Sequence, residues 1–233
     1  VLEPKRFADE VVVWDRRTDG GAMSPRRGKE WDKFLADNPG KTILTPSEYE
    51  DASAIAKAVH AHPVARQLLA HGEPEVSFFW VNADGRTCKG RADWVCEMTD
   101  VGGGRILVGL KTTRDARPRP FAAAAARLGY HLQWAWYQDG WIQADDSRDT
   151  LAPTMIEIVV ESEAPHAVAV YEIPQKVMDV GRAEISECLE LLKACEASGK
   201  WPGISDDVIE FDLPAWCYGC LLYTSDAADD TPC

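Results

Sequence analysis

The chain has 233 residues, of which 45% are hydrophobic, and no segment approaches the roughly 18 consecutive apolar residues of a membrane-spanning helix. These values predict one globular domain and no membrane partner. The formal net charge is −13, but residues 1–138 carry 20 Lys and Arg against 18 Asp and Glu, whereas residues 139–233 carry 5 against 20. The acidic excess therefore lies late in the chain and does not exclude a nucleic-acid partner for the rest, since charges beyond about 8 Å are screened.

The first 45 residues mix Pro, Gly and charge and predict loops around a short helix at RGKEWDKFLADN. They contain neither a starting Met nor an apolar signal core, so we expect an intracellular protein whose N-terminus is truncated. A helix is predicted over about 46–70, because Thr45 and Glu48 have capping-box spacing. Pro63 either kinks this helix or begins a second one.

Three strands are predicted next, at Glu75 to Val81, Thr87 to Met98 and Arg105 to Thr113, separated by the turn signals NADG and DVGGG. They should form an antiparallel meander. The remaining elements are a long helix from Phe121 to about Ala144, two strands at Ile156 to Val160 and Ala167 to Ile173, and a helix at about 175–198. This order predicts an α/β fold with a central mixed β-sheet flanked by helices.

The tail from Cys220 reads CLLYTSDAADD, which resembles translated sequencing adapter, so we expect residues 220–233 to be an artefactual addition to a domain spanning 46–219. The seven cysteines are irregularly spaced, which favours a reducing compartment. The single CxxC, Cys217 to Cys220, lacks a second ligand pair, and we predict no zinc or iron–sulfur site there.

One candidate site comes from adjacent strands. Alternate residues of a strand share a face, so Asp93 on GRADWVCEM and Lys111 on GRILVGLKTT can present a carboxylate and an ammonium at one place. A surface salt bridge would have the same pattern. Five basic residues follow Gly104 with one acid among them, which is compatible with phosphate binding: Arg105, Lys111, Arg114, Arg117 and Arg119.

The surrounding motifs distinguish these alternatives. GRADW, a strand ending in GLKTT and a helix bearing HLQWAWY together resemble the PD-(D/E)xK nuclease superfamily, specifically its RecE-like phage exonuclease branch of exonuclease VIII type. The resemblance extends to RRGKEW, ILTPSEYEDA and EVSFFW and covers about residues 25–216. It implies a PD-(D/E)xK nuclease core that hydrolyses phosphodiester bonds at linear duplex DNA ends in the 5′ to 3′ direction.

By position, the resemblance implies a metal-binding carboxylate at Asp93 and the motif lysine at Lys111. His62 would be a metal ligand, although the neighbouring His60 leaves open which of the two histidines takes that position. Glu75 would hold the metal through water or shape the site. The implied cofactor is Mg²⁺ or Mn²⁺. Gln133 and Tyr137 match a QxxxY helix motif whose side chains lie on one face and could hold DNA phosphate. The residues that would contact DNA are Arg91, Thr112, Thr113, Arg114, Arg117 and Arg119.

Gly109 departs from the resembled pattern, because an Asp or Glu is expected there as the second metal-binding acid. Three explanations remain open: a single-base change from Asp to Gly, a migrated acid such as Glu97 or Glu75, or an inactive homologue that still binds DNA. Glu97 lies about 13 Å along an extended strand from Asp93, which makes it a poor replacement. We expect the chain as given to digest linear duplex weakly or not at all with Mg²⁺, and Gly109→Asp to recover the activity.

The resemblance also implies a phage or prophage protein in the bacterial cytoplasm. Such a nuclease forms a toroidal homo-oligomer around DNA and passes the single strand to an annealing protein. The competing reading is a catalytically inactive DNA-end-binding or assembly protein with the same fold.

Overall fold

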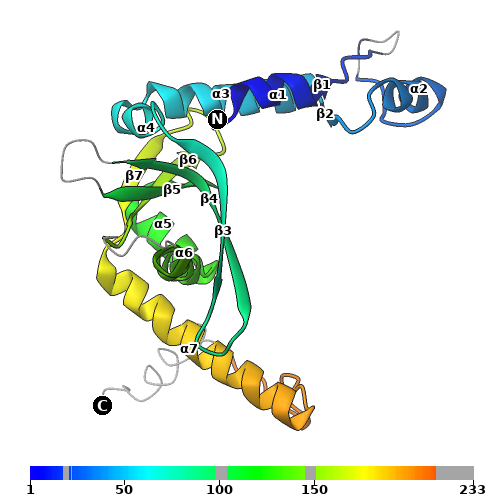
Figure 1. Ribbon diagram of the computed structural model, residues 1–233. Helices are drawn as coiled ribbons and strands as arrows, with labels where there is room; N and C mark the ends of the chain where they lie inside the picture. Colours follow the sequence, from blue (N-terminus) through cyan, green and yellow to red (C-terminus); the bar gives the residue numbers. More distant parts are fainter. Residues whose placement is uncertain (18–20, 22, 98–103, 145–150, 214–233) are drawn as a thin grey trace, which may run out of the picture. The chain divides into compact units, whose positions relative to one another are not determined.

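A computed structural model describes residues 1–17, 21, 23–97, 104–144 and 151–213 (Figure 1). The chain divides into two compact units, Val1–Glu187 and Cys188–Cys233. The CxxC at Cys217 to Cys220 and the adapter-like tail lie outside the described residues, as does Met98 at the predicted end of a strand. In the described part of the chain, no helix has both the length and the apolar character needed to cross a bilayer.

The N-terminal region contains more regular structure than the sequence predicts. The predicted short helix is α2, Lys29–Asp37, and it is accompanied by α1, Pro4–Glu10. Two short strands, β1 at Val11–Val13 and β2 at Thr42–Leu44, pair in parallel. Three-residue strands carry too little periodicity to be recognised in a sequence.

The next helical region is divided at Pro63. Helix α3 spans Pro46–Ala61 and α4 spans Pro63–Leu68. The capping box is present: the Thr45 hydroxyl accepts from the Glu48 backbone N–H, and the Glu48 carboxylate accepts from the Thr45 N–H. Of the two alternatives for Pro63, the structure confirms the start of a second helix.

The central sheet has five strands in the order β3-β4-β5-β6-β7 (Figure 1). These are β3, Glu73–Val81; β4, Thr87–Glu97; β5, Arg105–Thr113; β6, Thr154–Glu161; and β7, Val168–Glu172. Only the β5–β6 pair is parallel; the other neighbours are antiparallel. The predicted meander and the mixed sheet are therefore confirmed.

The predicted helix from Phe121 to Ala144 is wrong as a single element. It forms two helices, α5 at Pro118–Arg127 and α6 at Tyr130–Ala144. Gly129 between them has φ +69°, a left-handed conformation that ends a helix and that glycine adopts without strain. The last helix, α7, spans Gln175–Ser198, as predicted.

Apolar residues cover both faces of the sheet. On one face, Leu107 and Val159 pack with Trp134 and Ala135 of α6. On the other, Val108 and Ile158 pack with Val59 of α3. The parallel β5 and β6 are apolar on both faces, as expected for strands buried in the middle of a sheet. Polar side chains that interrupt this run therefore need a specific reason.

Candidate active site

The candidate site lies on the α6 face of the sheet, where three neighbouring strands present residues in a row. Strands β4 and β5 pair Trp94 with Val108, so Asp93 and Gly109 are the next positions along the two strands. Strands β5 and β6 pair Gly109 with Glu157. Residues at paired positions point to the same face of a sheet. Asp93, Gly109 and Glu157 consequently follow one another across three strands.

Asp93 is half-buried and fixed by the neighbouring strand. Its Oδ2 accepts a hydrogen bond from the Leu110 backbone N–H at 2.9 Å. A carboxylate has two oxygens with about four acceptor positions, so this bond orients Asp93 without using its full capacity.

Lys111 reaches the same place from β5, two residues beyond Gly109. Its Nζ donates to Gln133 Oε1 of α6 at 2.9 Å and lies 5.1 Å from the centre of the Tyr130 ring. The Glu157 Oε1 is 3.8 Å away. The ammonium is thus held between an amide, an aromatic face and a carboxylate, and its side chain is only 16% exposed.

Glu157 is the most deeply buried charged residue of the described chain, with 1% of its surface exposed. Its Oε2 accepts from Trp134 Nε1 at 2.5 Å. Its Oε1 is buried without a hydrogen-bond partner. Burial raises the pKa of Glu157 to about 7; Lys111 and the Trp134 N–H act in the opposite direction, and nearby Asp93 raises the pKa further.

These side chains enclose a cavity of about 10 Å³, which is room for one water-sized species. The four predicted residues Asp93, Lys111, Gln133 and Tyr137 line it. Gly109, Trp134 and Glu157 line it as well. The structure therefore brings together four residues that the sequence placed in one site, Asp93, Lys111, Gln133 and Tyr137.

His62 and Glu75 do not line this cavity. His62 lies between α3 and α4, where its Nδ1 accepts from the Ala65 N–H and caps α4. Glu75 lies on β3 with a positive φ of 55°, and its carboxylate pairs with Arg91 Nε at 2.9 Å. Neither residue therefore lines the cavity, although the β3–β4 register, which pairs Pro74 with Trp94 and Val76 with Ala92, sets Glu75 opposite Asp93.

The predicted DNA-contacting residues lie mainly at and beyond the C-terminal end of β5. Arg114, Arg117 and Arg119 are exposed, as is Thr112, whereas Thr113 is half-buried and its hydroxyl donates to the Asp115 carbonyl. Arg117 is held by Asp115, with its Nη2 2.5 Å from Oδ2. This pairing lowers the pKa of Asp115 to about 2.

The cavity suits a small hard cation, although it is not a dense ligand cluster. Among the described residues, no group of three or more His, Cys, Asp or Glu side chains is placed to hold a metal ion. Mg²⁺ nevertheless needs only one or two carboxylates, with water and substrate phosphate as its remaining ligands. Asp93 with spare acceptor positions and the unpartnered Glu157 Oε1 fit that requirement.

Glu157 was not predicted as a site residue. Its signal is visible in the sequence, because it is the one charged residue within the otherwise apolar run MIEIVV. An acid in the middle of a buried strand is costly unless it has a partner. The partner could not be found from the sequence, because it depends on how β6 aligns with β5.

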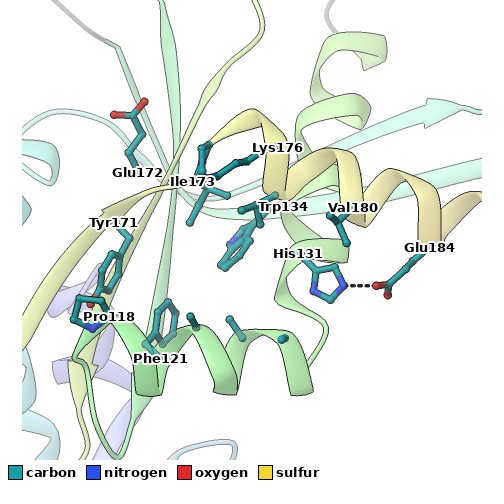
Figure 2. A pocket seen from close by; sticks show the side chains of 15 residues that line it. Pro118, Phe121, His131, Trp134, Tyr171, Glu172, Ile173, Lys176, Val180 and Glu184 are labelled. Carbon is teal, nitrogen blue, oxygen red and sulfur yellow. Dashed lines mark ion pairs between the residues drawn. The ribbon is translucent and has the colours of Figure 1, made fainter.

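A much larger cavity, of about 720 Å³, lies between α5, α6, β7 and the first half of α7 (Figure 2). Phe121 stacks on Tyr171 at one side, and His131 Nε2 pairs with Glu184 at 3.0 Å at the other. Trp134 lines this cavity as well as the small one. The lining is predominantly apolar, with His131, Glu172, Lys176 and Glu184 as its titratable side chains.

The mixed five-stranded sheet, with Asp93 and Lys111 on adjacent strands, is the arrangement of a PDDEXK-like nuclease fold. A family comparison agrees: residues 1–211 match the PDDEXK-like domain of unknown function DUF3799, and the chain belongs to that family. No curated protein matches the chain.

Solved structures that match the chain include two of different similarity. A protein from Eubacterium rectale described as a "putative exonuclease" superposes with a TM-score of 0.54 at 13% identity, covering 81% of this chain and 73% of its own. The protein SSO0001 gives a TM-score of 0.30 at 20% identity, covering 60% and 67%. The first supports the fold; the second is too distant to add to the argument.

Proposed function

We propose that the chain is a metal-dependent DNA exonuclease of the RecE-like phage recombination type, which hydrolyses phosphodiester bonds at linear duplex ends in the 5′ to 3′ direction. The observation that carries the proposal is that Asp93, Lys111, Gln133 and Tyr137 line one cavity of a PDDEXK-like fold. Surface ion pairing does not explain it, because the Lys111 ammonium bonds to Gln133 and both belong to this enclosed site.

In this proposal Asp93 holds Mg²⁺ or Mn²⁺. An ion held there would supply a water of lowered pKa and would offset the negative charge of the phosphate. Lys111 orients the attacking water and stabilises the charge that develops on the phosphate oxygens. Gln133 keeps the ammonium in place through its carbonyl oxygen, and its amide N–H groups remain able to donate to phosphate.

The wider assembly is part of the proposal and rests on the sequence resemblance. It includes a homo-oligomer that encloses duplex DNA, with Arg91, Thr112, Thr113, Arg114, Arg117 and Arg119 contacting the backbone. It also includes an annealing protein that receives the single strand, and an origin in a phage or prophage within the bacterial cytoplasm.

A second function is favoured by one observation, the glycine at position 109. A glycine cannot coordinate a cation through a side chain. If no other group replaces the missing acid, the chain binds DNA ends or takes part in assembly without cleaving DNA.

Digestion of linear duplex DNA tests the proposal. With Mg²⁺, we expect the protein to degrade linear duplex carrying a 5′ or a 3′ label and to leave covalently closed circular duplex intact. Asp93→Asn and Lys111→Ala should each reduce the rate at least about a hundredfold. Tight binding of linear duplex without degradation would favour the second function, and neither binding nor degradation would contradict both.

A further inference from the structure

The position left by Gly109 is not empty space. A Cβ atom added to Gly109 would lie 2.6 Å from the Glu157 Oε2 and closer still to its Oε1. Real Cβ atoms do not come within 3.0 Å of other heavy atoms. The Glu157 carboxylate therefore occupies the volume that the first side-chain atoms of an acid at 109 would fill.

The two positions are neighbours in the sheet as well as in space. Gly109 and Glu157 are partners in the β5–β6 register, and Lys111, two residues further along β5, points to the same face. The carboxylate reached from β6 thus lines the same cavity as the Asp93 and Lys111 side chains.

The surroundings of Glu157 leave one oxygen available. Trp134 donates to Oε2, whereas Oε1 has no hydrogen-bond partner and lies 3.8 Å from Lys111 Nζ. An unsatisfied buried carboxylate oxygen is costly, so native structures normally provide it with a donor, a water or an ion. Lys111 donates to Gln133 at the shorter distance of 2.9 Å, so Glu157 is not the principal hydrogen-bond partner of that lysine.

The other acids near the site are already used elsewhere. Glu97 is exposed at the end of β4 and lies 4.0 Å from Arg105 across the strands, and Glu75 pairs with Arg91. Neither lines the cavity. Glu97 is therefore poorly placed, and Glu75 lies opposite Asp93 on β3 but is paired with Arg91. The acid that lines the cavity, Glu157, comes from a different strand.

We propose that Glu157 supplies the second cation-binding carboxylate of the site, reaching from β6 into the place of the acid that position 109 lacks. This inference rests on the proposed nuclease function. The cation site then has two carboxylates, those of Asp93 and Glu157. Lys111 keeps its proposed role of orienting the attacking water. A second carboxylate from β6 also changes the expectation for Gly109→Asp, since that substitution alone would crowd two carboxylates together.

Cation binding by the full chain tests the inference independently of activity. Titration calorimetry with Mn²⁺ alone compares the unaltered protein with Glu157→Gln, Asp93→Asn and Glu97→Gln. The first two variants should each weaken binding at least about tenfold, because each removes an anionic ligand. Glu97→Gln is the matched control, since it removes an equal charge outside the cavity, and it should bind Mn²⁺ as the unaltered protein does.

An exchange of the acid between strands provides the reciprocal test. Gly109→Asp alone should not strengthen Mn²⁺ binding, whereas Gly109→Asp combined with Glu157→Val should recover the binding that a single Glu157→Val variant loses. Valine suits a buried strand and removes the clash. Circular dichroism and thermal unfolding of each variant show whether it is folded.

The outcomes separate this inference from the proposed function. If Glu157→Gln binds Mn²⁺ normally while Asp93→Asn does not, the inference is overturned and the nuclease site stands. If only the exchanged double variant binds Mn²⁺ and digests linear duplex, the inference is overturned and this chain is an inactivated nuclease. If no folded variant binds Mn²⁺ or digests DNA, both fail.

Discussion

Glu157 gives the site a pH-dependent cost in the absence of metal. Its pKa in the folded protein is about 7, above the ordinary value of 4.5, so the folded state binds the proton more tightly than the unfolded state does. The contribution of Glu157 to the free energy of unfolding is therefore largest below pH 4.5, and it is lost as the pH rises through 7. The loss amounts to about 3 kcal/mol above pH 7.

Urea unfolding in EDTA measures this effect. Glu157→Gln has no titrating group at this position. The free energy of unfolding of the variant minus that of the unaltered protein should therefore increase by about 3 kcal/mol from pH 4.5 to pH 8. Lys111 and Asp93, the charged groups that face Glu157, are present in both proteins. A difference between the two proteins that stays constant with pH would contradict the assignment.

At the residue scale, the sequence predicted the members of the site that belong to contiguous motifs. Asp93, Lys111, Gln133 and Tyr137 could be named because each stands in a short motif that resembles those of the PD-(D/E)xK nucleases. Gly109 could be recognised as an anomaly for the same reason. Glu157 could not be connected with it, since 48 positions of chain and two helices separate partners that only the β5–β6 register joins.

At the scale of elements, Gly140 determines how closely α6 approaches the sheet. A Cβ atom at this position would lie 2.5 Å from the ring of Trp80 on β3. Since α6 carries Gln133, Trp134 and Tyr137, the close contact at Gly140 also sets the distance between these side chains and Lys111 on β5.

Gly140→Ala should lower the free energy of unfolding by about 1–2 kcal/mol. Overpacking costs about 1–3 kcal/mol, and the better helix propensity of alanine returns up to about 1 kcal/mol. Urea unfolding measures the change. Gly104→Ala is the matched control, because its added Cβ would meet no atom within 4 Å. Equal stability of the two variants would show that α6 can shift away without cost.

Elements with a strong periodic signal were predicted well. The bounds of β5 and α7 agree with the sequence pattern, and α3 begins at its capping box. The division between α5 and α6 was missed because an alanine-rich run and an aromatic run are both compatible with one continuous helix. The break depends on the left-handed backbone at Gly129, and an isolated glycine in a helical pattern does not by itself reveal such a conformation.

For the molecule as a whole, the net charge of −13 is opposed by the exposed arginines beyond β5. These arginines differ in availability. Arg117 is held in a bidentate pair by Asp115, whereas Arg119 makes no ion pair with any residue that the structure describes. Neutralisation of phosphates by free arginines makes DNA binding salt-dependent.

Arg119→Ala should therefore weaken binding to linear duplex more than Arg117→Ala does. Fluorescence anisotropy at several salt concentrations measures this, in EDTA so that the DNA stays intact. The slope of log affinity against log salt should become shallower by about one for Arg119→Ala. Equal effects of the two substitutions would mean that DNA displaces Asp115 from Arg117.

The overlap between the Glu157 carboxylate and a side chain at 109 also constrains how this chain can arise from an ancestor with the acid on β5. Gaining Glu157 first would crowd two acids into one volume, and losing the acid at 109 first would leave the cation with Asp93 alone. If Glu157 holds the cation, as proposed above, substitutions at 109 and 157 are coupled. A linear motif that reads acid-x-lysine along one strand then does not detect the second acid, because that acid enters the site from β6.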